Sequence, residues 1–154
     1  MSEAPRTLLP PKVVLYVTSG RNLLVIREPE FPDIGLQPPG GTIEAGEAIE
    51  AAALRELEEE TGLAAERDQL AALGSETREF DFDGAHHTVD RHYFHVAIRG
   101  DVQERWTRWE MTPSSGGPPI LFELLWLSLD GPIELPYGRD AFLPELRALL
   151  ELPT

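Results

Sequence analysis

The alternation of apolar and polar residues divides the chain into segments with the character of strands and segments with the character of helices. Short runs rich in β-branched, aliphatic and aromatic residues, bounded by turn-forming residues, are typical of strands. The segments of this kind are residues 12–18, 23–27, 74–83, 88–98 and 120–129. Ser19 to Asn22 predicts a hairpin turn between the first two strands, and Asp83 to Ala85 predicts a bend between the third and the fourth.

Two further segments have the composition or the spacing of helices. Residues 47–61 contain Ala, Leu and Glu with neither Gly nor Pro, and Gly62 follows where a helix would end. Residues 140–150 place apolar side chains at helical spacing, namely Phe142, Leu143, Leu146, Leu149 and Leu150. Together with the strands, this order predicts an α/β protein in which helices flank a mixed β-sheet.

Three segments lack both patterns. Residues 1–11 are rich in proline and are expected to be a flexible N-terminal segment. Residues 28–41 hold four prolines and three glycines and predict a loop, and residues 101–119 predict a long irregular insertion. The chain has 154 residues without an internal repeat or an interdomain linker, so residues 12–154 are expected to form a single domain.

The acidic charge of the chain is concentrated in one short region. The net charge is −14, and residues 41–63 alone carry seven acids and one base, a net of −6. A field of this sign repels a bare polyphosphate or a nucleic-acid backbone. We therefore do not expect nucleic acid as a partner, and we expect anionic small molecules to approach together with metal cations.

The remaining composition limits the cellular setting. The chain has no cysteine, which excludes disulfides and thiolate zinc sites. The first ten residues lack the apolar core of a signal peptide, and the densest apolar stretches, Val13 to Val17 and Leu121 to Leu127, are too short to span a bilayer. We expect a soluble, cytoplasmic protein without a membrane partner.

Residues 41–63 follow a pattern of fixed spacing. The pattern is Gly41, five residues, Glu47, seven residues, Arg55-Glu56-Leu57, one residue, Glu59-Glu60, one residue, and Gly62-Leu63. At every fixed position it resembles the signature of the Nudix hydrolases, and the preceding Pro39-Gly40-Gly41 is similar to the lead-in that is common in that family. The resemblance implies the Nudix fold, an α/β/α sandwich with a mixed β-sheet, and metal-dependent hydrolysis of diphosphate linkages.

The charged residues of this pattern also predict a metal site by their own chemistry. Four of them fall within an arc of roughly 140° on a helix, at about 100° per residue. These are Arg55, Glu56, Glu59 and Glu60. Carboxylates three or four residues apart repel each other, and a hard divalent cation relieves that repulsion; Mg²⁺ suits a site shared with phosphates, and Mn²⁺ is the substitute. A solvated acidic helix face is the structural alternative, and Glu58, on another side of the helix, is expected to be of that kind.

Further roles follow from the resemblance. It implies that the carbonyl of Gly40 is a metal ligand beside the three glutamates. Glu47 is expected to form hydrogen bonds in or beside the metal site, and Arg55 is expected to orient a glutamate through a bidentate contact. The catalytic base that activates water is expected to be Glu59 or, from a distal strand, Glu123. An edge-strand or solvent-side position would explain Glu123 equally well.

The sequence is less informative about the substrate. Candidates for stacking on a base are Trp106, Trp109, Phe31, Phe80 and Tyr93, and candidates for holding phosphates are Arg78, Arg91 and Arg108. Core or loop packing is the alternative for each aromatic residue, and a salt bridge is the alternative for each arginine. His86, His87, His92 and His95 are expected to be polar strand residues and not a metal site. The loops at 28–40 and 101–119 are expected to decide which substrate binds.

Three functions are compatible with this pattern. The first is a housecleaning nucleotide pyrophosphatase that acts on a nucleoside diphosphate linked to another moiety. The second, removal of the 5′ diphosphate of RNA, finds no basic patch to support it. The third, a nucleotide sensor without turnover, has no need of the complete glutamate cluster. The expected partner is a small nucleotide-type molecule, and a homodimer is compatible with the sequence.

Overall fold

The computed structural model describes residues 5–113 and 116–153. The strands are β1 (Arg6–Leu8), β2 (Lys12–Ser19), β3 (Asn22–Arg27), β4 (Gly40–Thr42), β5 (Leu70–Phe82), β6 (Ala85–Ala97), β7 (Arg105–Glu110) and β8 (Ile120–Ser128). The α-helices are α1 (Ile49–Thr61) and α2 (Leu143–Leu149), and short 3₁₀ turns are η1 (Pro32–Ile34), η2 (Arg67–Gln69) and η3 (Pro136–Gly138). Neither α-helix within these residues has the length and apolar character that crossing a membrane requires.

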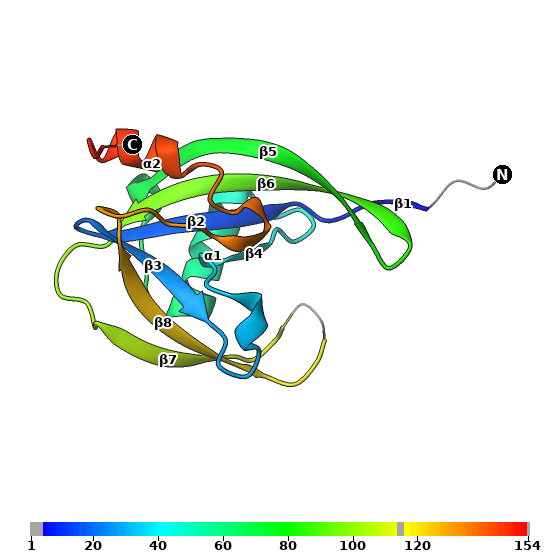
Figure 1. Ribbon diagram of the computed structural model, residues 1–154, viewed down its shortest axis with the longest axis horizontal. Coiled ribbons are helices and arrows are strands. Elements are labelled where there is room, and N and C mark those ends of the chain that lie inside the picture. Colours follow the sequence, from blue (N-terminus) through cyan, green and yellow to red (C-terminus); the bar gives the residue numbers. More distant parts are fainter. Residues whose placement is uncertain (1–4, 114–115, 154) are drawn as a thin grey trace.

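The strands form one sheet that mixes parallel and antiparallel pairs. Its order is β1-β6-β2-β3-β8-β7, with β5 paired to β6 and β4 paired to β2. β2 runs parallel to β6, whereas β3, β8 and β7 pair antiparallel in succession. The long β5–β6 hairpin, with β1 paired along it near its tip, extends well beyond the other strands (Figure 1). The mixed sheet predicted from the sequence is therefore confirmed.

Successive side chains of β2 point in turn to two apolar cores, which lie on opposite faces of the sheet. Val13, Leu15 and Val17 pack in one cluster with Ala53 and Leu57 of α1. The residues between them, Val14 and Tyr16, pack in the other cluster with Leu143 and Leu146 of α2. Because successive side chains of a strand point to opposite faces, one helix covers each face. This arrangement is the predicted α/β/α sandwich, with α1 and α2 on separate sides in Figure 1.

The two central strands β2 and β3 diverge, and this divergence makes room for the site. They pair only next to their turn, at Thr18–Leu23 and Ser19–Asn22. Farther along, β2 pairs with β4, and Ile26 of β3 forms a bridge to Gln37 instead. The chain from Gln37 to Thr42 thus enters between the separated strands, next to α1 (Figure 1).

Helix α1 agrees with the prediction except at its start. It begins at Ile49, after Ala48 in extended conformation, and not at residue 47. It ends at Gly62, which has a positive φ of 79° and donates its N–H to the Glu58 carbonyl, as expected of a helix-terminating glycine. The second helix is shorter than the predicted 140–150, because its first residues form turns before Leu143.

Two segments predicted to be irregular contain strands. Of the N-terminal segment 1–11, residues 1–4 lie outside the described residues, and Arg6–Leu8 pair with β6 as β1. In the predicted insertion 101–119, residues 114–115 lie outside the described residues, and Arg105–Glu110 pair with β8 as β7. Both are edge strands, so pairing with one neighbour defines them more than their own composition does.

Candidate active site

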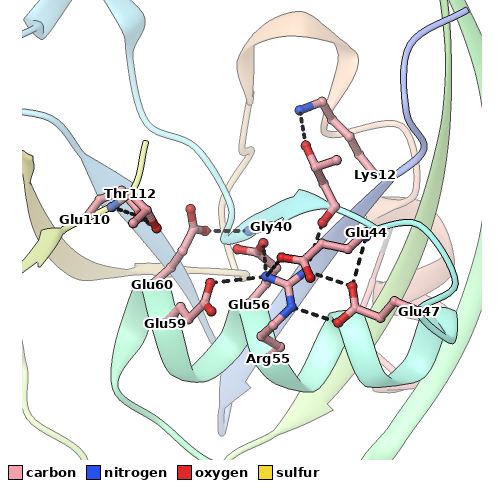
Figure 2. A network of polar contacts seen from close by, with 11 residues as sticks. Lys12, Gly40, Glu44, Glu47, Arg55, Glu56, Glu59, Glu60, Glu110 and Thr112 are labelled. Carbon is pink, nitrogen blue, oxygen red and sulfur yellow. Dashed lines mark hydrogen bonds and ion pairs between the residues drawn. The ribbon is translucent and has the colours of Figure 1, made fainter. Parts of the chain in front are cut away.

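Arg55 gathers carboxylates from α1 and from the segment that precedes it. Its Nε and Nη2 donate to the two carboxylate oxygens of Glu47, both at 2.8 Å, which is the bidentate contact expected of it. Its Nη1 donates to Glu56 at 2.8 Å and to Glu59 at 3.2 Å, and Nη2 also donates to the Thr42 carbonyl at 2.9 Å. Figure 2 shows the guanidinium at the centre of this network. Arg55 therefore fixes α1 to β4 and holds three glutamates in place.

Glu60 lies apart from this network. Its Oε1 accepts a hydrogen bond from the Gly40 backbone N–H at 2.7 Å (Figure 2). Gly41 passes so close to Glu56 that a Cβ there would overlap the Glu56 carboxyl group. The glycines of β4 thus allow the backbone to approach the acidic face of α1. Glu58, as predicted, is exposed to solvent on another side.

A cavity of about 420 Å³ opens between α1 and the diverging strands. Carboxylates from several elements line it, namely Glu28, Glu44, Glu56, Glu59, Glu60 and Glu110. Cationic side chains line it as well, namely Lys12, Arg55, Arg91 and Arg139. The backbone of residues 37–42 forms a wall between β2 and β3. The cavity therefore brings together residues that are distant in the sequence.

Burial and like charges alter the ionisation of the carboxylates in this cavity. Burial raises the pKa of Glu56 to about 7, with smaller contributions from the charges of Glu59 and Glu110. Burial also raises the pKa of Glu60 well above its usual range. In contrast, the hydrogen bonds from Arg55 lower the pKa of Glu47 to about 2. The surroundings of Glu56 and Glu60 thus disfavour the charged carboxylate, whereas Arg55 compensates the charge of Glu47.

Comparison with known proteins identifies the family. The sequence matches the NUDIX domain family over residues 8–144, which is most of the chain. The chain belongs to the Nudix family. It is a Nudix-family pyrophosphohydrolase, and both the resemblance and the class of enzyme predicted from the sequence are confirmed.

Solved structures show the same Nudix fold. The MutT NUDIX hydrolase from Burkholderia pseudomallei is 22% identical with a TM-score of 0.59, over 94% of this chain and 99% of that chain. The Ap4A hydrolase of C. elegans is 19% identical with a TM-score of 0.53, over 92% and 98%. A mutant of the Bacillus subtilis pyrophosphohydrolase BsRppH is 24% identical with a TM-score of 0.54, over 92% and 82%. No curated protein matches this sequence.

Nudix hydrolases typically depend on a divalent metal ion, and the residues of this cavity fit one. Among residues 5–113 and 116–153, no three acidic, histidine or cysteine side chains converge closely enough to hold an ion as they stand. Arg55 holds Glu56 and Glu59, while Glu60 is turned to the Gly40 N–H. Glu60 forms no salt bridge within the described chain; burial raises its pKa well above the usual range, and the hydrogen bond from the Gly40 N–H opposes that rise only in part. Such oxygen donors are those that a hard divalent cation prefers.

The structure places Glu123 away from the cavity. This residue lies on β8 and forms ion pairs with Arg27 at 3.0 Å and with Arg105 at 3.4 Å. The hydrogen bond from Arg27 is the main reason that the pKa of Glu123 is lowered. The neighbouring Phe122 lines the cavity instead, as alternation along a strand requires. Because β8 lies between β3 and β7, Glu123 is an ion-paired residue of an inner strand, and not the edge-strand or solvent-side residue that was the alternative to a catalytic role.

Two residues of β7 bind the end of α1. The Trp106 Nε1 donates to the Thr61 carbonyl at 2.9 Å, and the Arg108 Nε donates to the Glu59 carbonyl at 2.8 Å. These bonds satisfy carbonyls that the last turn of a helix leaves without partners. The indole of Trp106 also packs in the core beside α1. Stacking on a base is therefore not the role that this position supports.

Apart from Arg91, which lines the cavity, the other substrate candidates also lie outside its lining. Trp109 on β7 is 52% exposed, and Phe80 stacks on His87 near the tip of the β5–β6 hairpin. Arg78 donates to Glu76 and to the Gly138 carbonyl. The ring of Tyr93 is fully buried, and the half-exposed Phe31 lies outside this lining as well. The four histidines lie on β6, as predicted for polar strand residues.

Several residues of the cavity were missed by sequence reasoning. They are Lys12, Glu28, Gln37, Glu110 and Arg139, and Arg91 was considered only as one of several arginines. Glu110 gave no signal either, since Trp106 and Trp109 are three residues apart and hydrophobicity does not alternate along Arg105–Glu110. The others lie on separate segments, and no local pattern connects them.

Proposed function

We propose that this protein hydrolyses a diphosphate linkage in a nucleoside diphosphate joined to a further group, in the presence of Mg²⁺ or Mn²⁺. The observation that supports this most is the Glu60 carboxylate, which shares a cavity with Glu56 and forms no salt bridge within the described chain. An uncompensated carboxylate in such a place is costly, and a cation that arrives with the substrate phosphates would offset that cost.

In this proposal, the glutamates Glu56, Glu59 and Glu60 hold the metal ion, with the Gly40 carbonyl as a further candidate ligand. A bound divalent ion would stabilise the negative charge that develops on the phosphate oxygens. Arg55 keeps Glu56 and Glu59 oriented through the hydrogen bonds described above. The bidentate pair with Glu47 fixes Arg55 in turn.

Glu59 is the best-supported catalytic base. Its side chain is about half exposed and lines the cavity, so a water molecule can reach it from solvent. Glu110 is the second candidate, because it lines the same cavity from β7. Glu123 has less support, since its carboxylate is engaged by Arg27 and Arg105.

The test is hydrolysis of a panel of nucleoside di- and triphosphates, nucleotide sugars and dinucleotides with Mg²⁺ or Mn²⁺, followed by phosphate release. Glu59→Gln removes a general base and should lower kcat/KM by about 10²–10⁴-fold. Glu60→Gln removes a metal ligand and should abolish Mg²⁺-dependent turnover while the protein remains folded. Glu58→Gln is the matched control, because Glu58 is exposed on another side of the same helix and should leave activity unchanged.

Two outcomes would contradict the proposal. Wild-type activity in both Glu59→Gln and Glu60→Gln would remove the metal assignment. If no member of the panel is hydrolysed with either metal, nucleotide binding without turnover would replace hydrolysis as the function.

A further inference from the structure

The cavity has an acidic end, formed by Glu56, Glu59 and Glu60, and a basic end, formed by Lys12, Arg91 and Arg139. Lys12 on β2 and Arg91 on β6 are direct neighbours across the parallel pair of strands, so their side chains leave the same face of the sheet. Arg139 follows η3 and lines the same cavity. Three cationic side chains from three distant parts of the sequence therefore converge on one space.

Two of these cations, Lys12 and Arg139, lack the carboxylate partners that buried cations usually have. Lys12 Nζ donates to Thr42 Oγ1 at 3.3 Å, and Arg139 Nη1 donates to the Gln37 amide oxygen at 3.4 Å. Within residues 5–113 and 116–153, neither side chain forms a salt bridge. The nearest ion pair at this end is a long one of 3.7 Å between Arg91 and Glu76.

Arg91 carries the clearest sign of a missing partner. Its side chain is only 8% exposed, and within the described chain its buried Nε has no hydrogen-bond partner. A buried donor without a partner costs free energy, and a guanidinium more than a neutral group. An anion at the basic end would relieve that cost.

Like charges act on one another at this end. Burial lowers the pKa of Lys12, and the positive charges of Arg139 and Arg91 lower it further. Burial and the charge of Arg91 also lower the pKa of Arg139. The charges of Glu56 and Glu60 raise the pKa of Lys12 and so oppose this shift, which shows that the acidic end is close to Lys12. Within the described residues, no hydrogen bond or salt bridge joins Lys12 to these glutamates. The acidic and the basic ends of the cavity are therefore neighbours whose side chains do not pair with each other.

Backbone contacts fix the position of the basic end. Arg91 Nη1 donates to the Tyr137 carbonyl at 2.6 Å, and Tyr16 Oη on β2 donates to the Arg139 carbonyl. The Arg139 guanidinium also lies 5.3 Å from the centre of the Tyr137 ring. Side chains of the sheet therefore hold the segment that carries Arg139, and the cations are placed before any ligand arrives.

We propose that Lys12, Arg91 and Arg139 bind an anionic group of the substrate directly, beyond the diphosphate that the glutamates bind through metal. This inference rests on the proposed function for the position of that diphosphate. It assigns the substrate to the class in which the group joined to the nucleoside diphosphate is itself anionic, such as a chain of three or more phosphates. A neutral sugar in that position would leave the three cations uncompensated.

The first test measures binding of inorganic phosphate by calorimetry in the presence of EDTA, at constant ionic strength. Without metal the acidic end cannot bind the anion, so any binding belongs to the basic end. Each of Lys12→Met and Arg139→Met should weaken binding by about tenfold, as expected for loss of one charge-assisted hydrogen bond. Arg21→Met is the control with the same change of charge, because Arg21 is exposed and pairs with Asp130.

Absence of phosphate binding to the wild-type protein would overturn the inference, and so would binding to Lys12→Met and Arg139→Met that equals that of the wild type. This experiment requires no turnover, so it can succeed where the proposed hydrolysis fails. Arg91 is left intact in it, since its contact with Tyr137 also supports the fold.

The second test compares kcat/KM for ATP with that for ADP-glucose, in which the group beyond the diphosphate is neutral. Lys12→Met should lower the ratio of the two values by about tenfold through an increase in KM for ATP, while Arg21→Met should preserve it. An equal loss for both substrates would mean that Lys12 acts on the fold or on the shared diphosphate, which contradicts a separate anion subsite.

Discussion

Residues of one type have different roles here because their surroundings differ. Glu58, Glu59 and Glu60 are consecutive, yet one faces solvent, one reaches Arg55 and one is turned to the Gly40 N–H. Glu47 keeps its charge at low pH because Arg55 compensates it, whereas burial raises the pKa of Glu60. At the scale of single residues, the partner of each carboxylate decides its chemistry.

His95 makes the stability of the protein sensitive to acid. It is buried with Nε2 at 2.8 Å from Thr18 Oγ1, and burial lowers its pKa. In the unfolded chain a histidine takes up a proton near pH 6.5. The contribution of neutral His95 to the free energy of unfolding therefore falls as the pH drops below that value. The stability advantage of the wild type over His95→Gln should shrink by up to about 1 kcal/mol between about pH 7.5 and 5.5.

Urea unfolding of both proteins at the two pH values measures this difference. The subtraction removes the opposite effect of Glu56 and Glu60, whose raised pKa values favour the folded state at low pH. A difference between the two proteins that does not change with pH would contradict the assignment.

At the scale of elements, the site depends on the approach of β4 to α1. Residues 37–42 fill the gap between the diverging β2 and β3, and Arg55 ties β4 to the helix through the Thr42 carbonyl. On the other side, Trp106 and Arg108 of β7 bind the last carbonyls of α1. The helix that carries the glutamates is therefore fixed from two sides by strands.

Gly41→Ala tests this close approach. The added Cβ would overlap the Glu56 carboxyl group, which can move because it is the end of a flexible side chain. We expect little change in melting temperature and a loss of about 100-fold in kcat/KM, the effect of a small misplacement in an active site. Gly131→Ala is the control, since a Cβ there meets no atom of the described chain within 4 Å. Wild-type activity in Gly41→Ala would show that the position of Glu56 is not critical.

At the scale of the whole molecule, the net charge of −14 opposes folding, most strongly around residues 41–63. A cation bound by the folded state alone should therefore stabilise it. Mg²⁺ at about 100 times its dissociation constant would add about 2.7 kcal/mol, which raises the melting temperature by several degrees. The rise should persist in Glu58→Gln and disappear in Glu60→Gln, with NaCl of equal ionic strength as the salt control. An equal rise in both variants would indicate general screening.

Local patterns were sufficient for much of the fold. β2 and β3 have continuous apolar runs around a turn, and Gly62 ends α1 with the positive φ that favours glycine. The spacing in residues 41–63 likewise placed Arg55 and the glutamates on one side of a helix, because helical geometry depends only on separation along the chain. These features need no knowledge of distant partners.

Edge strands and the walls of the cavity were decided only by tertiary structure. β1 and β7 are defined by pairing with β6 and β8, and Trp106 and Glu123 take roles set by those neighbours. The basic end joins residues from β2, β6 and the segment after η3, whose separation in sequence carries no periodic signal. The sequence by itself determined the acidic helix and which of its charged side chains share one side, because both are local. Which cations face that helix was decided by long-range packing of the sheet.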